Sequence, residues 1–139
     1  MAQSPRPLMS FVMVARNDDF HGDYRYRLSM CLDFLCKGLA ETGHTRDTEI
    51  IVCDWGSEVP LHEELELHPS AREQVKFLVV PRALALERQV RGSTFAYPIG
   101  LNAAVRRAAG EYICELTADI VMTAASIDML MAIFAGKYP

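Results

Sequence analysis

A continuous apolar run, Ser10-Phe11-Val12-Met13-Val14-Ala15, ends abruptly in the polar segment Arg16-Asn17-Asp18-Asp19. A short apolar run without alternating polar residues is typical of a strand that is buried on both faces of a sheet. The polar residues directly after it indicate a loop. The sequence therefore predicts a first buried strand that ends near Ala15.

The same pattern recurs three times along the chain. Apolar runs occupy residues 49–53, 75–80 and 111–116, and polar residues or a proline follow each of them. Proline cannot donate a ladder hydrogen bond, so Pro81 closes the third run. We predict three further strands, which end near Cys53, Val80 and Leu116.

Helical patterns separate the predicted strands. Leucines at 28, 32, 35 and 39 follow the spacing of an amphipathic helix over residues 24–40, and Gly43 offers its end. Weaker signals predict a short helix near residues 61–67 and a helix that begins at Pro98, continues through Ala109 and stops at Gly110. Ser126 is the expected N-cap of a last helix over residues 127–135, ended by Gly136. We expect residues 83–96 to form a loop.

Alternating strands and helices predict an α/β fold, a three-layer sandwich with a mainly parallel sheet, because parallel neighbours need crossover connections. In such sheets, ligands bind outside the carboxyl ends of the strands. Arg16, Asn17 and Asp18 follow the first strand, Asp54 the second, Arg82 the third and Asp119 the fourth. We expect these side chains to gather at one edge of a single domain over residues 1–139.

Composition excludes several classes of protein. Half of the 139 residues are apolar and the formal net charge is −4, so the chain can bury a core and carries no basic footprint for nucleic acid. The apolar run near the amino terminus is too short for a membrane span or a signal sequence. We predict a cytoplasmic protein. The four cysteines lack metal-binding spacing, and we expect them to be reduced residues of the core.

Three stretches together resemble the inverting glycosyltransferases of the large family 2 type, which have the GT-A fold. They cover most of the chain in the order of that family, at residues 11–18, 49–57 and 100–120. The resemblance implies that the chain binds a nucleotide-diphosphate sugar and transfers the sugar to an acceptor. It also implies that this chain is the amino-terminal, donor-binding part of a longer, truncated enzyme.

By this resemblance, the nucleoside lies against Ala15, Arg16, Asn17 and Asp18 and against Asp54. An ionised carboxylate suits such a site, because it accepts strong hydrogen bonds from ribose hydroxyls or a base N–H. Asp54 has an alternative role as a turn residue before Gly56. Asn102 matches an asparagine that opens the helix before the fourth strand in the family and completes the implied nucleotide-binding set.

Asp119 is the implied metal ligand. The family carries a DxD motif whose carboxylates hold a divalent cation on the diphosphate, but here the first position is Thr117. A hard ion such as Mg²⁺ or Mn²⁺ can be held by one or two carboxylates together with phosphate oxygens and water. A second departure is Trp55, which stands where the family has another acidic residue and leaves the nucleobase open.

The general base of such an enzyme is not evident. After Asp119 the chain contains only Asp128 as an acidic residue, and it lies inside the last predicted helix. Two functions therefore stay open: a glycosyltransferase completed by parts beyond this chain, or a non-catalytic nucleotide-binding or interaction domain on the same fold. The acceptor, the oligomeric state and a peripheral association with membranes are also open.

Overall fold

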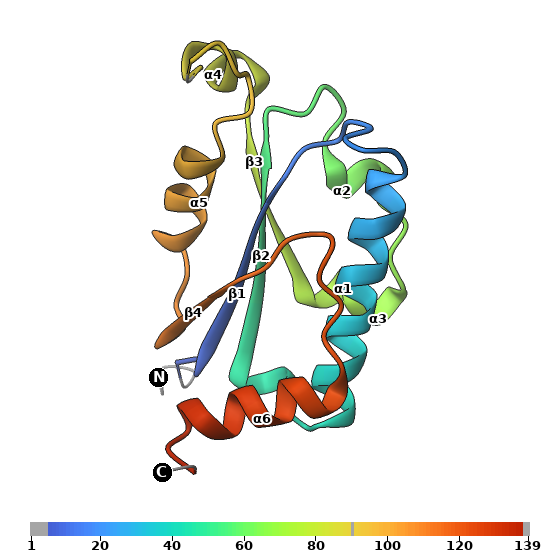
Figure 1. Ribbon diagram of the computed structural model, residues 1–139, viewed down its shortest axis with the longest axis vertical. Coiled ribbons are helices and arrows are strands. Elements are labelled where there is room, and N and C mark those ends of the chain that lie inside the picture. Colours follow the sequence, from blue (N-terminus) through green and yellow to red (C-terminus); the bar gives the residue numbers. More distant parts are fainter. Residues whose placement is uncertain (1–5, 90, 138–139) are drawn as a thin grey trace.

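The computed structural model of the protein describes residues 6–89 and 91–137. Its centre is a four-stranded sheet built from β1 (Met9–Ala15), β2 (Thr48–Trp55), β3 (Val75–Val80) and β4 (Tyr112–Glu115). The strand order is β3-β2-β1-β4, and each neighbouring pair is parallel (Figure 1). The predicted α/β architecture with a parallel sheet is confirmed. The strand ends fall within two residues of those expected from the sequence.

The direction of the crossovers reverses at β1. The chain moves outward from β1 to β2 and β3, and then returns past β1 to place β4 on the other side. The central strand β1 is consequently buried along its whole length, as the continuous apolar run predicts. The edge strand β4 alternates between half-buried and exposed residues.

One face of the sheet is covered by α1 (Tyr24–Glu41), the short helices α2 (Leu61–Glu64) and α3 (Pro69–Gln74), and α6 (Ala124–Phe134). A 3-10 turn, η1 (Thr45–Asp47), connects α1 to β2. Leu28, Leu32 and Leu35 of α1 are at most 1% exposed, which confirms the predicted leucine stripe. They pack with the odd-numbered residues of β1 in the larger of two cores.

The opposite face is covered by α5 (Tyr97–Val105), while α4 (Arg82–Glu87) lies at the carboxyl ends of β2 and β3 (Figure 1). The even-numbered Val12 and Val14 of β1 point to this side and pack with Trp55 and the alanines of α5. Layers on both faces of the sheet make a three-layer arrangement. Successive side chains of a strand point to opposite faces of the sheet, so the residues of β1 contribute alternately to the two cores.

Three expectations about helices need correction, and one further helix was not expected. Residues 82–87 form α4 within the segment expected to be a loop, and α3 had no clear sequence signal. Helix α5 ends at Val105, before the expected stop at Gly110. Helix α6 begins at Ala124 because the Thr123 side chain, and not Ser126, caps it by accepting from the Ser126 N–H. In each case tertiary contacts or a competing cap decide the boundary.

Gly110 does not end a helix, and it instead allows a close approach of the backbone to Ser10. Its N–H donates to Ser10 Oγ at 2.8 Å, and a Cβ at this position would collide with the Ser10 backbone. Ser10 donates in turn to the buried carboxylate of Glu49, which also accepts from the Ala109 N–H and from Lys76 Nζ at 2.9 Å. This network fastens the connection before β4 to the beginnings of β1 and β2.

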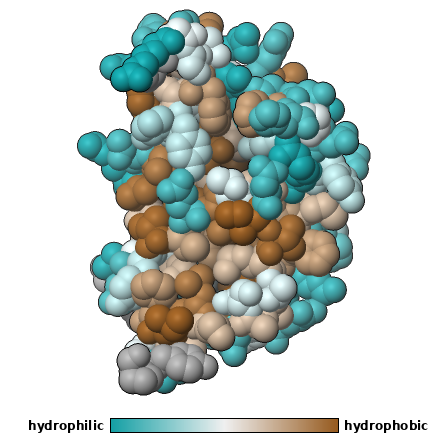
Figure 2. Space-filling view, in the orientation of Figure 1, coloured by the Kyte–Doolittle hydropathy of each residue, from teal (hydrophilic) through white to brown (hydrophobic). Residues whose placement is uncertain are grey.

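All four cysteines are free, and three of them are buried, as expected for reduced core residues. No helix in the described part of the chain has the length and apolar character needed to cross a membrane. Figure 2 shows a band of apolar side chains on one face of the molecule, over β4, α5 and α6. Exposed apolar residues of these three elements include Ile113 in β4, Ile99 in α5 and Ile133 in α6.

Candidate functional site

The strand order reverses between β1 and β4, and we refer to the region between the carboxyl ends of these two strands as the crevice. Residues 16–23 lead from β1 to α1, residues 116–123 lead from β4 to α6, and both helices pack on the same face of the sheet. Open α/β sheets bind ligands outside the carboxyl ends of their strands at the switch point, where the strand order reverses. The site is therefore built from the loop after β1, the loop after β4 and the first turn of α1.

Arg27, in the first turn of α1, connects these three parts. Its Nη1 forms an ion pair with Asp119 in the loop after β4. Its Nε donates to the carbonyl of Gly22 at 3.3 Å, and its Nη2 donates to the carbonyl of Phe20. The Tyr24 ring lies under the guanidinium, with its centroid 5.4 Å away. Four contacts thus hold a positive charge at the crevice.

The loop that Arg27 holds has an uncommon backbone. His21, Gly22 and Asp23 have φ values of 57°, 73° and 49°, so three successive residues adopt left-handed conformations. Only glycine adopts this conformation without cost. The two carbonyl contacts of Arg27 offset part of that cost and fix the loop beside Asp119.

Asp119 lies on a turn after β4 and has an exposed side chain, with 63% of its surface accessible. The ion pair uses its Oδ1, and Oδ2 makes no hydrogen bond to the described residues. No group of three or more potential metal-ligating side chains occurs among residues 6–89 and 91–137. Asp119 thus offers a single carboxylate, and a Mg²⁺- or Mn²⁺-type ion bound there would need to take its other ligands from phosphate and water.

Two tyrosines border the crevice. Burial, together with the nearby negative charge of Asp18, raises the pKa of Tyr24 to about 12. Burial and a short hydrogen bond to the Glu115 carboxylate raise the pKa of Tyr97 to about 12. Both phenols therefore stay neutral at physiological pH. The single O–H of Tyr97 is already donated to Glu115, whereas that of Tyr24 makes no hydrogen bond to the described residues and can donate to a ligand.

Arg16 and Asp18 face each other across the loop after β1. Arg16 Nε and Nη2 both lie 2.6 Å from Asp18 Oδ2, and Nη1 donates to Thr94 Oγ1 at 2.9 Å. The Arg16 guanidinium also lies over the Phe95 ring, 5.2 Å from its centroid. The structure therefore joins the loop after β1 to the segment before α5, with Arg16 stacked between them.

Asn17 and Asp54 have mainly structural contacts. Asp54 is fully buried, and its two carboxylate oxygens accept from Ser57 Oγ and from the Leu61 N–H at 2.7 Å. Ser57 Oγ also accepts from the Asn17 N–H at 2.7 Å. This arrangement matches the alternative role of Asp54 as a turn residue, because a ligand in solvent has no access to its oxygens in this conformation.

The remaining predicted residues are spread more widely. Ala15 is buried at the end of β1, where only its backbone can border the site. Asn102 lies in the middle of α5 and is exposed, so it does not open that helix. Arg82 is exposed in the first turn of α4. The structure thus brings Arg16, Asp18 and Asp119 near the crevice, and gives Asn102 and Arg82 no contact with them in the described residues.

A groove adjoins the crevice on the α2 side and shares Asp18 and Tyr24 with it. Its volume is about 1010 Å³. It is strongly acidic, and Arg25, its only lysine or arginine, is paired with Glu64 at 2.8 Å. An uncompensated anion would be repelled by this groove. Its carboxylates come from Asp18, Asp19, Asp23, Glu58, Glu64 and Glu66.

Sequence reasoning missed Arg27, Tyr24 and the pair formed by Tyr97 and Glu115. From the sequence alone, Arg27 is indistinguishable from the other polar residues on the exposed side of an amphipathic helix. Its position one turn into the helix after the first strand is the only signal, because that turn faces the switch point. Tyr97 and Glu115 are eighteen residues apart and meet only after the helix α5 returns the chain to the sheet.

Comparison with models of known protein families found no match, and comparison with curated proteins found none either.

Proposed function

We propose that the chain binds a nucleoside diphosphate sugar at the crevice between β1 and β4, as the donor-binding part of an inverting glycosyltransferase with a GT-A-type domain. The observation that carries the proposal is the pair Arg27–Asp119, which sits at the switch point of a parallel sheet. This pair offers a cationic group for phosphate and a carboxylate for a hard cation at one place. The family resemblance of the three stretches supports the same function.

The nucleoside is assigned to the β1 side of the crevice. Arg16 and Asp18 present a guanidinium and a carboxylate there, next to the half-buried Phe95 ring. Hydrogen bonds to a ribose or a base need such polar groups, and an aromatic ring nearby supports stacking. Asp54 contributes by shaping this loop through Ser57 and Asn17.

The diphosphate is assigned to the β4 side, near Asp119. A divalent cation held there would neutralise charge on the departing nucleoside diphosphate. The protein's own contribution is to present the exposed Asp119 carboxylate and the Arg27 guanidinium. Tyr24, which is neutral, can donate a hydrogen bond at the same edge.

Donor binding without chemistry is the second candidate, and one observation favours it. Asp128 is the only acidic residue after Asp119, and its carboxylate lies 3.2 Å from Nε2 of His44, which follows the far end of α1. It therefore cannot act as the base for an acceptor at the crevice. The chain as described would then bind a nucleotide and leave the acceptor to other parts.

Calorimetric titration of the chain with UDP, GDP, ADP and CDP, with and without Mn²⁺, tests the proposal. We expect one nucleotide to bind preferentially and Mn²⁺ to tighten its binding. Binding of the matching nucleotide sugar, followed by release of free sugar, distinguishes a transferase half-site from a binding domain. Absence of binding by all four nucleotides, with and without Mn²⁺, would contradict the proposal.

A further inference from the structure

Arg27 is the residue of the crevice whose role the sequence does not reveal. We propose that Arg27 binds the diphosphate of the donor, and that Asp119 occupies its guanidinium until an anion displaces the carboxylate. This inference rests on the proposed function, because it names the residue that receives the diphosphate in the same site. Its physical basis is the unequal way in which the two partners of the ion pair are held.

Arg27 is fixed independently of Asp119. Its side chain is 26% exposed, and the carbonyls of Gly22 and Phe20 accept from Nε and Nη2. The Tyr24 ring covers one face of the guanidinium. If Asp119 moves away, these contacts keep the guanidinium at the crevice with Nη1 free to donate.

Asp119 is the replaceable partner. Its side chain is 63% exposed, and Arg27 is its only hydrogen-bond partner among the side chains and backbone of the described residues. An exposed ion pair contributes little to stability, so exchanging one anion for another at Arg27 costs little. A phosphate oxygen suits the exchange, because guanidinium donors match phosphate geometry and charge.

The charges around the crevice favour Arg27 over its neighbours. Arg16 lies on the β1 side and already donates to Asp18 and Thr94. Arg25 points into the acidic groove and pairs with Glu64. Arg27 alone of these three faces the loop after β4, where the fourth strand ends at the switch point.

Substitution of Arg27 and substitution of Asp119 should therefore change the affinity for an anion in opposite directions when no metal is present. Removing Arg27 deletes the donor. Removing the charge of Asp119 releases the donor and also removes a nearby negative charge. A purely structural ion pair would give no such opposition, since loss of either partner would have the same effect.

Inorganic pyrophosphate, in metal-free buffer with a chelator, is the probe, because it needs no knowledge of the nucleobase. We expect Asp119→Asn to bind it about tenfold more tightly than the unaltered chain and Arg27→Gln to bind it about tenfold more weakly. The double variant should bind clearly more weakly than Asp119→Asn, because the donor is absent from it. Arg25→Gln is the matched control, since it removes a paired arginine two residues earlier in the same helix.

Affinity that is unchanged in Asp119→Asn, or equal in Arg27→Gln and Arg25→Gln, would overturn the inference. Circular dichroism shows whether each variant folds, and if Arg27→Gln does not, the gain in Asp119→Asn decides alone. The nucleotide titrations separate the two proposals. Nucleotide binding without any response of pyrophosphate to Arg27 removes only this inference. A response of pyrophosphate without nucleotide binding removes the proposed function.

Discussion

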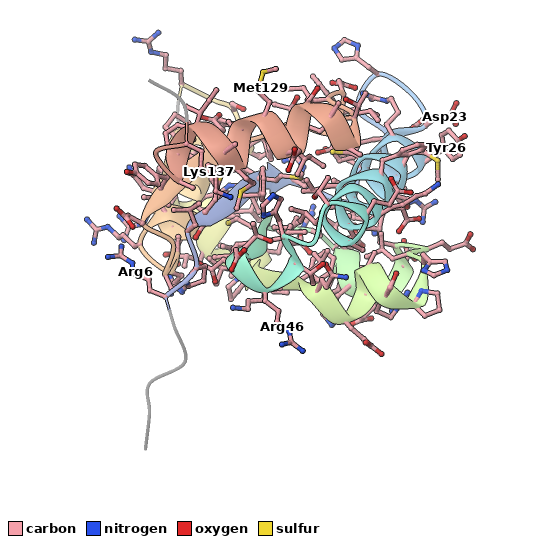
Figure 3. All side chains as sticks on the ribbon, turned by 90° about the horizontal axis from the view of Figure 1, so that it is seen from below. Arg6, Asp23, Tyr26, Arg46, Met129 and Lys137 are labelled. Atoms are coloured by element: carbon pink, nitrogen blue, oxygen red, sulfur yellow. The ribbon has the colours of Figure 1, made fainter. Side chains whose placement is uncertain are left out.

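Each end of the sheet carries a carboxylate that accepts hydrogen bonds, but the two lie in opposite settings. At the end where the strands begin, Glu49 is 7% exposed and accepts from Ser10, Lys76 and a backbone N–H. At the end where they finish, Asp119 is 63% exposed and has Arg27 as its partner. Figure 3, seen from the first end, shows Arg6 and Arg46 projecting from that side, whereas Asp23 and Tyr26 lie at the start of α1.

The comparison separates carboxylates that build the fold from those that can bind a ligand. A buried carboxylate must have its oxygens satisfied internally, and those bonds then leave it no capacity for a ligand. Asp54 lies at the carboxyl end of β2 but belongs physically with Glu49, because both of its oxygens accept internal donors. Position at the correct edge of a sheet is therefore insufficient to identify a binding residue.

The largest effect expected from this comparison concerns stability and Asp54. Asp54→Ala removes both acceptors and leaves Ser57 Oγ and the Leu61 N–H without their partner, so we expect a loss of about 3 kcal/mol in the free energy of unfolding. Urea denaturation followed by circular dichroism measures it. Nucleotide affinity, measured on the folded fraction, should fall as well if the loop shaped by Asp54 holds the nucleoside.

Asp119→Ala is the matched control, because it removes an aspartate from the same edge of the sheet. Its side chain is exposed, so we expect a change below about 0.5 kcal/mol in unfolding free energy. Equal losses in the two variants would show that burial does not separate the two classes of carboxylate.

The next effect concerns Glu49 and its dependence on pH. Burial acts to raise the pKa of Glu49, but hydrogen bonds from Ser10, Ala109 and Lys76 outweigh it and lower the pKa below its ordinary value of 4.5. A lowered pKa means that the ionised form stabilises the fold above pH 4.5 and that this contribution is lost as the pH falls through the folded-state pKa. Glu49→Gln should cost about 2 kcal/mol at pH 7.

Denaturation at a series of pH values checks this expectation. The difference between the unaltered chain and Glu49→Gln should be constant above pH 4.5 and should shrink at lower pH. A difference that stays constant down to the acid transition would show that the charge of Glu49 does not contribute.

Much of the fold follows from the sequence because burial imposes simple patterns. The run over residues 10–15 and the leucines of α1 are each dictated by contact with the sheet, and both predictions are confirmed. The helices α4 and α3 were missed, since six-residue helices are decided by tertiary contacts and not by periodicity. Gly110 was misread because its role is a close approach to Ser10, one hundred residues earlier.

The candidate site was less accessible to sequence reasoning. The pattern of strand ends indicates that Asp18 and Asp119 share an edge, and the structure places both near Tyr24. The pattern of strand ends could not indicate that Asp54 is buried or that Arg27 pairs with Asp119. Both facts depend on how the loops return to the sheet. Binding of nucleotide and metal by these residues stays a prediction.

A smaller effect than those on stability concerns metal binding. If Asp119 holds the cation, Mn²⁺ should tighten binding of the preferred nucleoside diphosphate by about tenfold, within the usual range of coupling between two ligands. Asp119→Asn should abolish that gain, because asparagine keeps the shape but lacks the charge that a hard cation needs. Calorimetry with and without Mn²⁺ measures the gain. A full metal effect in the variant would make Asp119 a turn residue.

The smallest expected effect concerns Tyr97, whose hydroxyl donates to Glu115 at the exposed edge of the site. Tyr97→Phe removes that bond but leaves the carboxylate open to water, so we expect a loss of at most about 0.5 kcal/mol in unfolding free energy. Glu115 is exposed, and water replaces the lost hydrogen-bond donor there.

If the phenol borders the bound nucleotide sugar, the same substitution should weaken nucleotide-sugar binding more than it weakens the fold. Thermal unfolding and calorimetry on one preparation compare the two effects. A large loss of stability with unchanged affinity would place Tyr97 with Glu49 and Asp54, among the residues that build the fold and do not bind the ligand.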